Sequence, residues 1–96
     1  MEEVVYHVVY VEAVVREDIP RMSKKDRSRV SRAIEQKLTT QPDVFGKPLR
    51  RSLKGRWSLR VGAYRVIYRI DGRTVRIHFI GFRSTVYVDA FKRMFS

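Results

Sequence analysis

The sequence of 96 residues contains no cysteine, which excludes disulfide bonds and metal sites built on thiolates. It also lacks any run approaching the ~20 apolar residues that a membrane-spanning helix requires. The apolar N-terminal stretch MEEVVYHVVYVEAVV begins with two glutamates after Met1, whereas a secretory signal begins with basic residues. We therefore expect a cytoplasmic protein, without a metal or another cofactor.

Acidic residues are scarce as well. Ten Asp and Glu face twenty-one Lys and Arg, which gives a formal net charge of +11. Residues 1–20 contain five acidic residues and one arginine, whereas residues 47–73 contain nine basic residues and one acidic one. Such an excess favours a polyanionic partner that contacts the second half, with nucleic acid as the first candidate. An anionic membrane surface and a merely solvated basic surface are the alternatives.

The apolar pattern predicts a single α+β domain over residues 1–96. Ser23 and Asp26 are the capping pair that begins the longer N-terminal helix, and Pro20 is expected to end the helix before it. We expect a small, mostly antiparallel sheet with an N-terminal helical pair and a short C-terminal helix, all packed on one face. The expected elements are a strand over 4–11, helices over 12–19 and 24 to about 38, strands over 56–61, 63–70 and 74–80, and a helix over 85–95.

The dipeptide Asp71-Gly72 predicts a two-residue turn between the last two strands. That register places Arg65 opposite His78 and sorts the strands into an apolar face and a polar face. Arginine offers planar forked donors suited to phosphate, so the polar face is a candidate anion-binding surface. Ile67 also falls on this face, and a partner segment packing across the sheet would explain it. The polar face is expected to carry Arg56, Arg60, Arg65, Arg69, Arg76 and His78.

The segment GKPLRRSLKGRWSLRVGAYRVIYRID, with FRSTVY downstream, resembles the RelE branch of the RelE/ParE toxin superfamily over nearly the whole chain. The resemblance implies a toxin of a type II toxin–antitoxin pair. RelE-like toxins enter the ribosomal A site and cut mRNA there, and this activity is our main prediction. ParE-like relatives share the fold and inhibit DNA gyrase without cleaving RNA, and such inhibition by binding is the alternative. A passive RNA-binding protein is a third possibility.

The resemblance also implies roles for individual residues. Arg65, in AYRVIY, matches the arginine that contacts the scissile phosphate, and Arg60 matches a basic position on the preceding strand. Arg83 and Tyr87, in FRSTVY, match a C-terminal arginine and a tyrosine that stacks on a nucleotide and helps to orient the attacking ribose hydroxyl. Further RNA-binding residues are expected at Arg50, Arg51, Lys54, Arg56, Arg69 and Arg76.

The implied reaction is attack of the ribose 2′-OH on the adjacent 3′ phosphate, which requires proton transfers and a stabilised phosphate. Ser58 stands where some family members have lysine, and Phe82 where many have histidine. Only His7 and His78 have side chains that normally titrate near neutrality, and His7 is expected in the core or at a sheet edge. One hypothesis is that His78, which nearby arginines would favour in its neutral form, supplies the acid or base that Phe82 does not. The alternative is a polar residue without a catalytic role.

The resemblance implies partners as well. Besides the ribosome and mRNA, we expect an acidic cognate antitoxin that is partly disordered when free and wraps the domain. It is expected to cover the basic face or to displace the C-terminal helix near Tyr87. The toxin–antitoxin complex is expected to be a higher oligomer that binds operator DNA through the antitoxin. No membrane partner is expected.

Overall fold

A five-stranded sheet forms the centre of the computed structural model, which describes residues 5–95. The strand order is β1-β5-β4-β3-β2. β1 runs parallel to β5, and every other pair of neighbours is antiparallel, so the predicted mostly antiparallel sheet is confirmed. Residue 4, at which the first strand was predicted to begin, lies outside the described residues. The strands are β1 (His7–Tyr10), β2 (Lys47–Pro48), β3 (Trp57–Val61), β4 (Tyr64–Asp71) and β5 (Thr74–Phe82).

The helices largely follow the predicted boundaries. Ser23 begins α2, and its Oγ accepts a hydrogen bond from the backbone N–H of Asp26 at 3.1 Å. The first helix does not end before Pro20 as predicted, because helical backbone runs without a break to Arg21 and Pro20 is the second residue of α1. Within residues 5–95, no helix is long and apolar enough to cross a membrane. The helices are α1 (Ile19–Arg21), α2 (Lys24–Ala33), α3 (Pro42–Phe45) and α4 (Val86–Phe95), with π-helical turns at Val14–Asp18 and Ile34–Leu38 and a 3-10 turn at Arg51–Leu53.

One face of the sheet packs on α2 and its π-helical extension. Val30, Ile34 and Leu38 recur at every fourth position and are buried against the sheet, as their spacing predicts. The hydroxyl of Tyr68 donates to the carbonyl oxygen of Pro42 at 2.6 Å, and burial raises the pKa of this phenol. This cluster is the main hydrophobic core.

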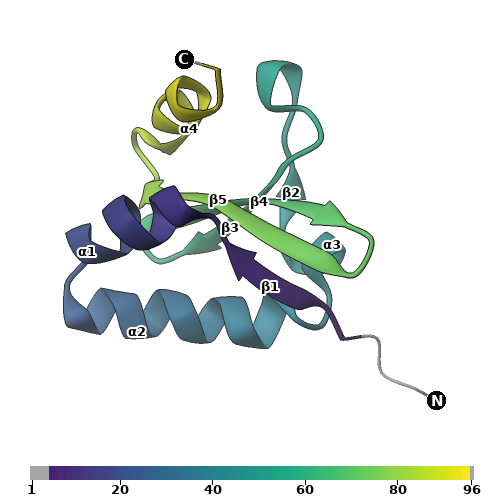
Figure 1. Cartoon of the computed structure of the whole chain (residues 1–96), viewed down its shortest axis with the longest axis horizontal. Helices are drawn as coiled ribbons and strands as arrows, with labels where there is room; N and C mark the ends of the chain where they lie inside the picture. Colours follow the sequence, from purple (N-terminus) through teal and green to yellow (C-terminus); the bar gives the residue numbers. More distant parts are fainter. Residues whose placement is uncertain (1–4, 96) are drawn as a thin grey trace.

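The opposite face carries α4, which lies above the sheet in Figure 1 while α2 lies below it. Ile67 and Phe79 on the sheet and Val86 and Ala90 on α4 form a second buried cluster. The prediction that all helices lie on one face is therefore wrong. Ile67 does need a covering segment, as its position in the sequence pattern indicated, and the chain supplies that segment itself.

The hairpin between β4 and β5 turns one residue later than predicted. Asp71 pairs with Thr74, so the two turn residues are Gly72 and Arg73. Gly72 has a φ of 59°, and Arg73 keeps a negative φ. A two-residue turn with glycine at its first central position needs a positive φ only there, which explains why Arg73 is accepted.

A β-bulge then changes the register within the hairpin. Tyr68 pairs with Ile77, whereas Ile67 pairs with Phe79, so His78 is an extra residue on β5. Up to Ile77 the side chains lie on the predicted faces. Beyond the bulge, the side chains of β5 lie on the face opposite to the one predicted. Phe79 accordingly packs under α4 instead of facing α2.

Candidate functional site

An apolar row divides the basic residues on the α4 side of the sheet. The row consists of Ile67 and its partner Phe79 on β5, and α4 packs on these two residues. The β3 partner of Ile67 is the polar Ser58. Arg65 and Arg69 lie two residues to either side of Ile67 along β4. Four residues at ~3.3 Å each separate the two arginines by roughly 13 Å. The basic face is thus two groups of arginines, one on each side of α4.

The first group is joined by a buried serine. Nη1 of Arg65 donates to Oγ of Ser58 at 3.4 Å, and the hydroxyl of Tyr87 donates to the same oxygen at 3.3 Å. The guanidinium carbon of Arg65 lies 5.9 Å from the centroid of the Tyr87 ring. Ser58 is 2% exposed, whereas Arg65 and Tyr87 reach the surface. We call Ser58, Arg65 and Tyr87 the Arg65 cluster.

Two further predicted arginines lie at the same end of the sheet. Arg60 pairs directly with Arg65 across β3 and β4. Arg83 follows β5, and its backbone N–H donates to the carbonyl oxygen of Ala63 at 2.8 Å. Both arginines are exposed, and neither forms an ion pair within the described part of the chain. Both arginines therefore add exposed positive charge at the end of the sheet that carries the Arg65 cluster.

Phe82 points to the other side of the sheet. It pairs with Tyr64, and the two rings stack with centroids 4.9 Å apart. The Tyr64 hydroxyl donates to Oδ2 of Asp26 at 3.1 Å. The pKa of Tyr64 is raised by burial first and then by this hydrogen bond. At the position where many family members have histidine, this chain has a ring that packs toward α2.

The second group of arginines lies beyond the C-terminal end of α4. Arg69 pairs with Arg76, and Asp71 accepts from Nε of Arg69 at 3.1 Å and lies 3.7 Å from Nε of Arg76. Arg56 precedes β3, and its guanidinium carbon lies 5.5 Å from the centroid of the Phe95 ring. We call Arg56, Arg69 and Arg76 the distal row. Asp71 neutralises part of its charge.

The predicted pairing of His78 with Arg65 is wrong. Arg65 pairs with Gly81. The turn lies one residue later than predicted, which shifts the partner by two positions, and the bulge at His78 shifts it by one more. His78 lies near the distal row, and its pKa is lowered by burial first and then by the positive charges of that row. Its Nε2 atom is buried without a hydrogen-bond partner among the described residues. The catalytic role considered for His78 rested on the predicted pairing, so His78 is not part of the site proposed below.

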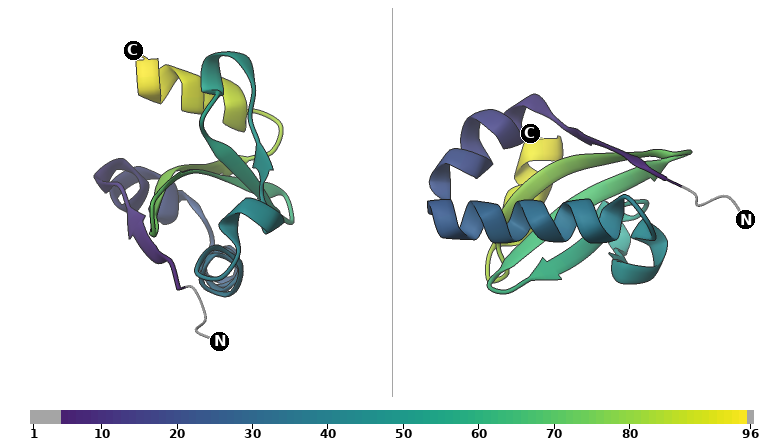
Figure 2. Two further views of the ribbon diagram at one scale, coloured as in Figure 1. Left: turned by 90° about the vertical axis from the view of Figure 1, so that its right-hand side faces the viewer. Right: turned by 90° about the horizontal axis from the view of Figure 1, so that it is seen from below.

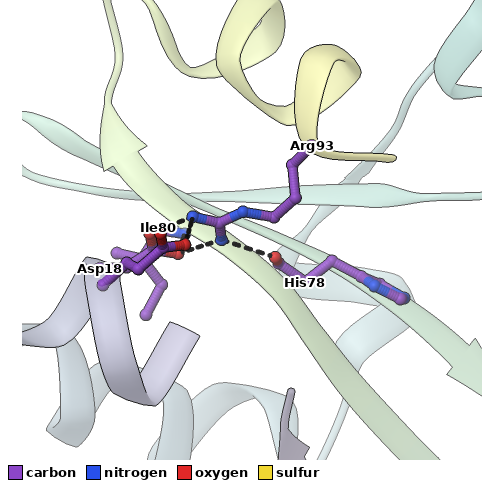
Figure 3. A network of polar contacts seen from close by, with 5 residues as sticks. Asp18, His78, Ile80 and Arg93 are labelled. Atoms are coloured by element: carbon purple, nitrogen blue, oxygen red, sulfur yellow. Dashed lines mark hydrogen bonds and ion pairs between the residues drawn. The ribbon is translucent and has the colours of Figure 1, made fainter. Parts of the chain in front are cut away.

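An ion pair fixes α4 to the rest of the fold (Figure 3). Arg93 donates from Nη1 and Nη2 to the two carboxylate oxygens of Asp18, each at 2.7 Å, and this interaction is the main reason that the pKa of Arg93 is raised. Asp18 is 2% exposed and also accepts from the backbone N–H of Ile80 at 3.0 Å. Nη1 of Arg93 also donates to the carbonyl oxygen of His78 at 3.2 Å. The ion pair thus holds the helix whose first turn carries Tyr87.

The remaining predicted RNA-binding residues lie on the segment between β2 and β3. Arg50, Arg51 and Lys54 are all exposed. In Figures 1 and 2 this segment and α4 extend from the same face of the sheet, side by side. The segment therefore adds positive charge next to the Arg65 cluster.

The Arg65 cluster has the chemistry of an anion site. Its contacts involve guanidinium and hydroxyl groups, which donate hydrogen bonds to phosphate oxygens. Among residues 5–95, no group of three or more His, Cys, Asp or Glu side chains has the arrangement needed to hold a metal ion. Sequence reasoning noted Ser58 as a position where some family members have lysine, and missed that Ser58 joins Arg65 to Tyr87.

Comparisons with known proteins identify the family of this chain. A family model described as "ParE toxin of type II toxin-antitoxin system, parDE" matches residues 9–87. The chain is 36% identical to toxin RelE of Mycobacterium tuberculosis over 75 residues, which are 78% of this chain and 76% of that protein.

Solved structures give the same result. The toxin–antitoxin complex RelBE2 of M. tuberculosis matches with a TM-score of 0.78 at 34% identity, covering 86% of this chain and 97% of that one. A mutant of E. coli toxin RelE in the free state matches with a TM-score of 0.63 at 16% identity, covering 94% and 98%, which supports the fold alone. The chain belongs to the RelE/ParE superfamily of toxins of type II toxin–antitoxin systems, and within it to the RelE branch.

Proposed function

We propose that the protein is a ribosome-dependent endoribonuclease that cuts mRNA in the A site by attack of a ribose 2′-OH on the adjacent phosphate. The observation that carries this proposal is the Arg65 cluster, in which a guanidinium group and a tyrosine hydroxyl donate to one buried acceptor, Oγ of Ser58. These are the two residue types that the family resemblance assigns to the scissile phosphate and to the neighbouring nucleotide.

In this proposal Arg65 binds the oxygens of the scissile phosphate, and Arg60, its cross-strand neighbour, adds a second positive charge. The negative charge on the phosphate increases in the pentavalent transition state, so donors that are already in place stabilise that state more than the substrate. One preorganised donor of this kind contributes on the order of 3–4 kcal/mol, or 10²–10³ in rate.

Tyr87 and Arg83 act on the attacking hydroxyl and on the leaving oxygen, respectively. Tyr87 stacks on a nucleotide and orients the attacking hydroxyl, since its ring is partly exposed and its own hydroxyl is held by Ser58. As the 2′ oxygen bonds to phosphorus, the bond from phosphorus to the 5′ oxygen breaks; the 2′-OH gives its proton to water, and the 5′ oxygen takes a proton from water. Arg83 stabilises the leaving 5′ oxygen by its positive charge, because arginine is a poor proton donor. The rest of the acceleration comes from in-line orientation of the mRNA. We therefore expect weak cleavage of free RNA and strong cleavage on the ribosome.

We also propose that a cognate antitoxin controls the toxin. The M. tuberculosis RelBE2 structure is a toxin–antitoxin complex, and its toxin-like chain shares the fold of this protein. An acidic antitoxin suits a chain with a net charge of +11. It would block the Arg65 cluster by covering the basic face or by displacing α4, and it would carry the operator-DNA contacts of the assembled complex.

The test is to incubate the protein with translating ribosomes and to map the mRNA ends. Cuts within A-site codons that disappear in Arg65→Ala support the nuclease. The second candidate function is inhibition of DNA gyrase by binding, and the observation that supports it is the ParE description of the matching family. Intact mRNA together with accumulated gyrase–DNA cleavage complexes would establish gyrase inhibition instead. Binding to RNA with neither product would indicate a passive RNA-binding protein.

A further inference from the structure

A groove lies beside Tyr87, between α4 and the segment that follows β2. Its volume is about 480 Å³, within the range of sites that hold small ligands. The groove is continuous with the Arg65 cluster, because Tyr87 belongs to both. The apolar side chains that line it are Leu49, Leu53, Tyr87, Val88 and Phe91.

The α4 side of this groove is apolar although it is exposed. Val88 is 59% exposed and Phe91 43% exposed, whereas Val86 and Ala90 on the sheet side of α4 are fully buried. The helix is therefore apolar on two sides, and packing against the sheet explains only one of them. Single exposed apolar residues are common, but these two line the same groove. A flat apolar ligand would cover both.

The other side of the groove carries positive charge on an unusual backbone. Arg51 has a φ of 57°, the only positive φ of a non-glycine residue in the described part of the chain. Side chains other than glycine rarely adopt this conformation, and such positions cluster at ligand-binding sites. Arg50 and Arg51 both line the groove and are exposed. The site therefore combines an apolar interior with a cationic rim.

We propose that this groove binds one base of the mRNA, next to the phosphate at the Arg65 cluster. This inference rests on the proposed function. Aromatic and apolar walls fit the face of a base, and the two rim arginines fit the flanking phosphates. An apolar segment of a protein partner would also fill the interior, but the continuity with Tyr87 and the arginine rim favours a nucleotide.

The chemistry of the groove also sets its selectivity. The walls formed by Leu49, Val88 and Phe91 offer no side-chain hydrogen-bonding groups to a base edge. Ser52, Arg50 and Arg51 also line the groove and carry hydrogen-bonding groups. The apolar walls therefore contribute a preference by stacking strength, which does not fix the identity of the base. We expect purines to be favoured over pyrimidines at this position of the codon.

The test is photo-crosslinking with the full-length chain and a single-stranded RNA that carries one 4-thiouridine and 2′-O-methyl groups, so that cleavage is blocked. The RNA is used free and on programmed ribosomes, and the crosslinked peptides are mapped by mass spectrometry. We expect crosslinks within residues 87–91 or 49–53. Phe91→Ser should reduce them at least fivefold, and so should Val88→Asn, which avoids the contact of Phe91 with Phe95.

Phe45→Ser is the matched control, because Phe45 is 46% exposed and lies on α3, outside the groove. It should leave the crosslinks in place. Crosslinks confined to other peptides, no crosslinks with either RNA, or equal losses in the Phe91 and Phe45 variants overturn the inference. A loss of antitoxin affinity in Phe91→Ser with unchanged crosslinks also overturns it and assigns the groove to the antitoxin. Groove crosslinks with unmodified mRNA left intact would instead contradict the proposed nuclease alone.

Discussion

Ser58 is the residue on which the geometry of the candidate site depends. It supplies an oxygen acceptor where some family members have a lysine cation, so its contribution here is positional. The hydroxyl is buried and accepts from both Arg65 and Tyr87. At 3.4 and 3.3 Å, both bonds are longer than the usual range for N–H···O and O–H···O hydrogen bonds, and each therefore contributes little to stability. Their effect is to restrict where the two partly exposed side chains point.

Replacing Ser58 with alanine should therefore affect turnover more than folding. Both donors can turn to water, so we expect a stability loss of about 0.5–1.5 kcal/mol. Cleavage on the ribosome should fall by up to about tenfold, mainly in kcat, because about 1.4 kcal/mol corresponds to a factor of ten. Urea unfolding and single-codon cleavage rates measure the two effects, with Ser28→Ala on the exposed side of α2 as the control. An unchanged kcat would contradict the positional role.

His78 should make folding stability depend on pH. Its pKa in the folded protein is lowered by burial and by the distal row, whereas the unfolded side chain has an ordinary pKa of about 6.5. The unfolded state then binds the proton more readily, so stability falls as the pH decreases through that value. The free energy of unfolding should fall less between pH 7.5 and 5.5 in His78→Gln than in the wild type. Equal losses would contradict this account, and His7→Gln on the edge strand β1 is the control.

At the scale of elements, α4 is a helix docked across an apolar row and fixed at its far end. The contact of Val86 and Ala90 with Ile67 and Phe79 supplies apolar burial, and the Arg93 ion pair with Asp18 supplies a specific position. The same helix carries Tyr87 at its beginning. Docking of α4 therefore couples the second core to the geometry of the Arg65 cluster.

Removing one partner of this ion pair should destabilise the folded protein. Arg93→Met leaves the carboxylate of Asp18 buried without its charged partner, and such a change destabilises a protein by on the order of 3 kcal/mol. The double variant Asp18→Leu/Arg93→Met removes both charges and should recover part of this loss. The recovery is incomplete, because Asp18→Leu also removes the acceptor of the buried Ile80 N–H. Urea unfolding of the two single variants and the double variant tests the coupling. Losses that simply add in the double variant would show that the two residues act independently.

The elements differ in how far the sequence predicts them. The four-residue spacing in the second helix and the Ser23 cap predict that helix correctly, because both signals are local. The strand faces are predicted correctly as far as Ile77. The bulge at His78 is not predictable from alternation, since Ile77, Phe79 and Ile80 allow either register. Tertiary packing decides between them by placing Phe79 under α4.

The candidate site is predictable to a similar degree. The resemblance to RelE-like toxins brought Arg65 and Tyr87 together, and the structure confirms that they are neighbours. Asp18 and Arg93 are 75 residues apart in the sequence, and no local pattern links them. The position of the apolar Ile67 on the predicted polar face correctly indicated a covering segment. That segment is α4 of the same chain and not a partner.

At the scale of the whole molecule, the positive charge is distributed on both sides of α4. A single strand of RNA bound at the Arg65 cluster must pass beside α4 to reach the distal row. Each phosphate that an arginine neutralises releases counterions, so the salt dependence of RNA binding reports how many arginines take part.

Removal of two distal arginines should therefore change this salt dependence. For Arg69→Gln/Arg76→Gln, we expect the slope of log affinity against log salt to decrease in magnitude by at most about 1.4, or 0.7 for each phosphate on a single strand. Pairing with Asp71 makes the true change smaller. Titrations of RNA by fluorescence anisotropy at several salt concentrations measure it, with Arg16→Gln/Arg21→Gln as the control. An unchanged slope would place the distal row outside the RNA path.

The most direct test of the account is the rate of mRNA cleavage on programmed ribosomes in a single turnover, with the wild type, Arg65→Gln and Arg73→Gln. Both variants remove one positive charge from the same hairpin, but Arg73 lies in its exposed turn, far along β4 from the Arg65 cluster. We predict that Arg65→Gln slows cleavage by on the order of 10²–10³ and that Arg73→Gln stays within about threefold of the wild type. Equal rates for the two variants, or no cleavage by the wild type, would contradict the claim that the Arg65 cluster is a nuclease site.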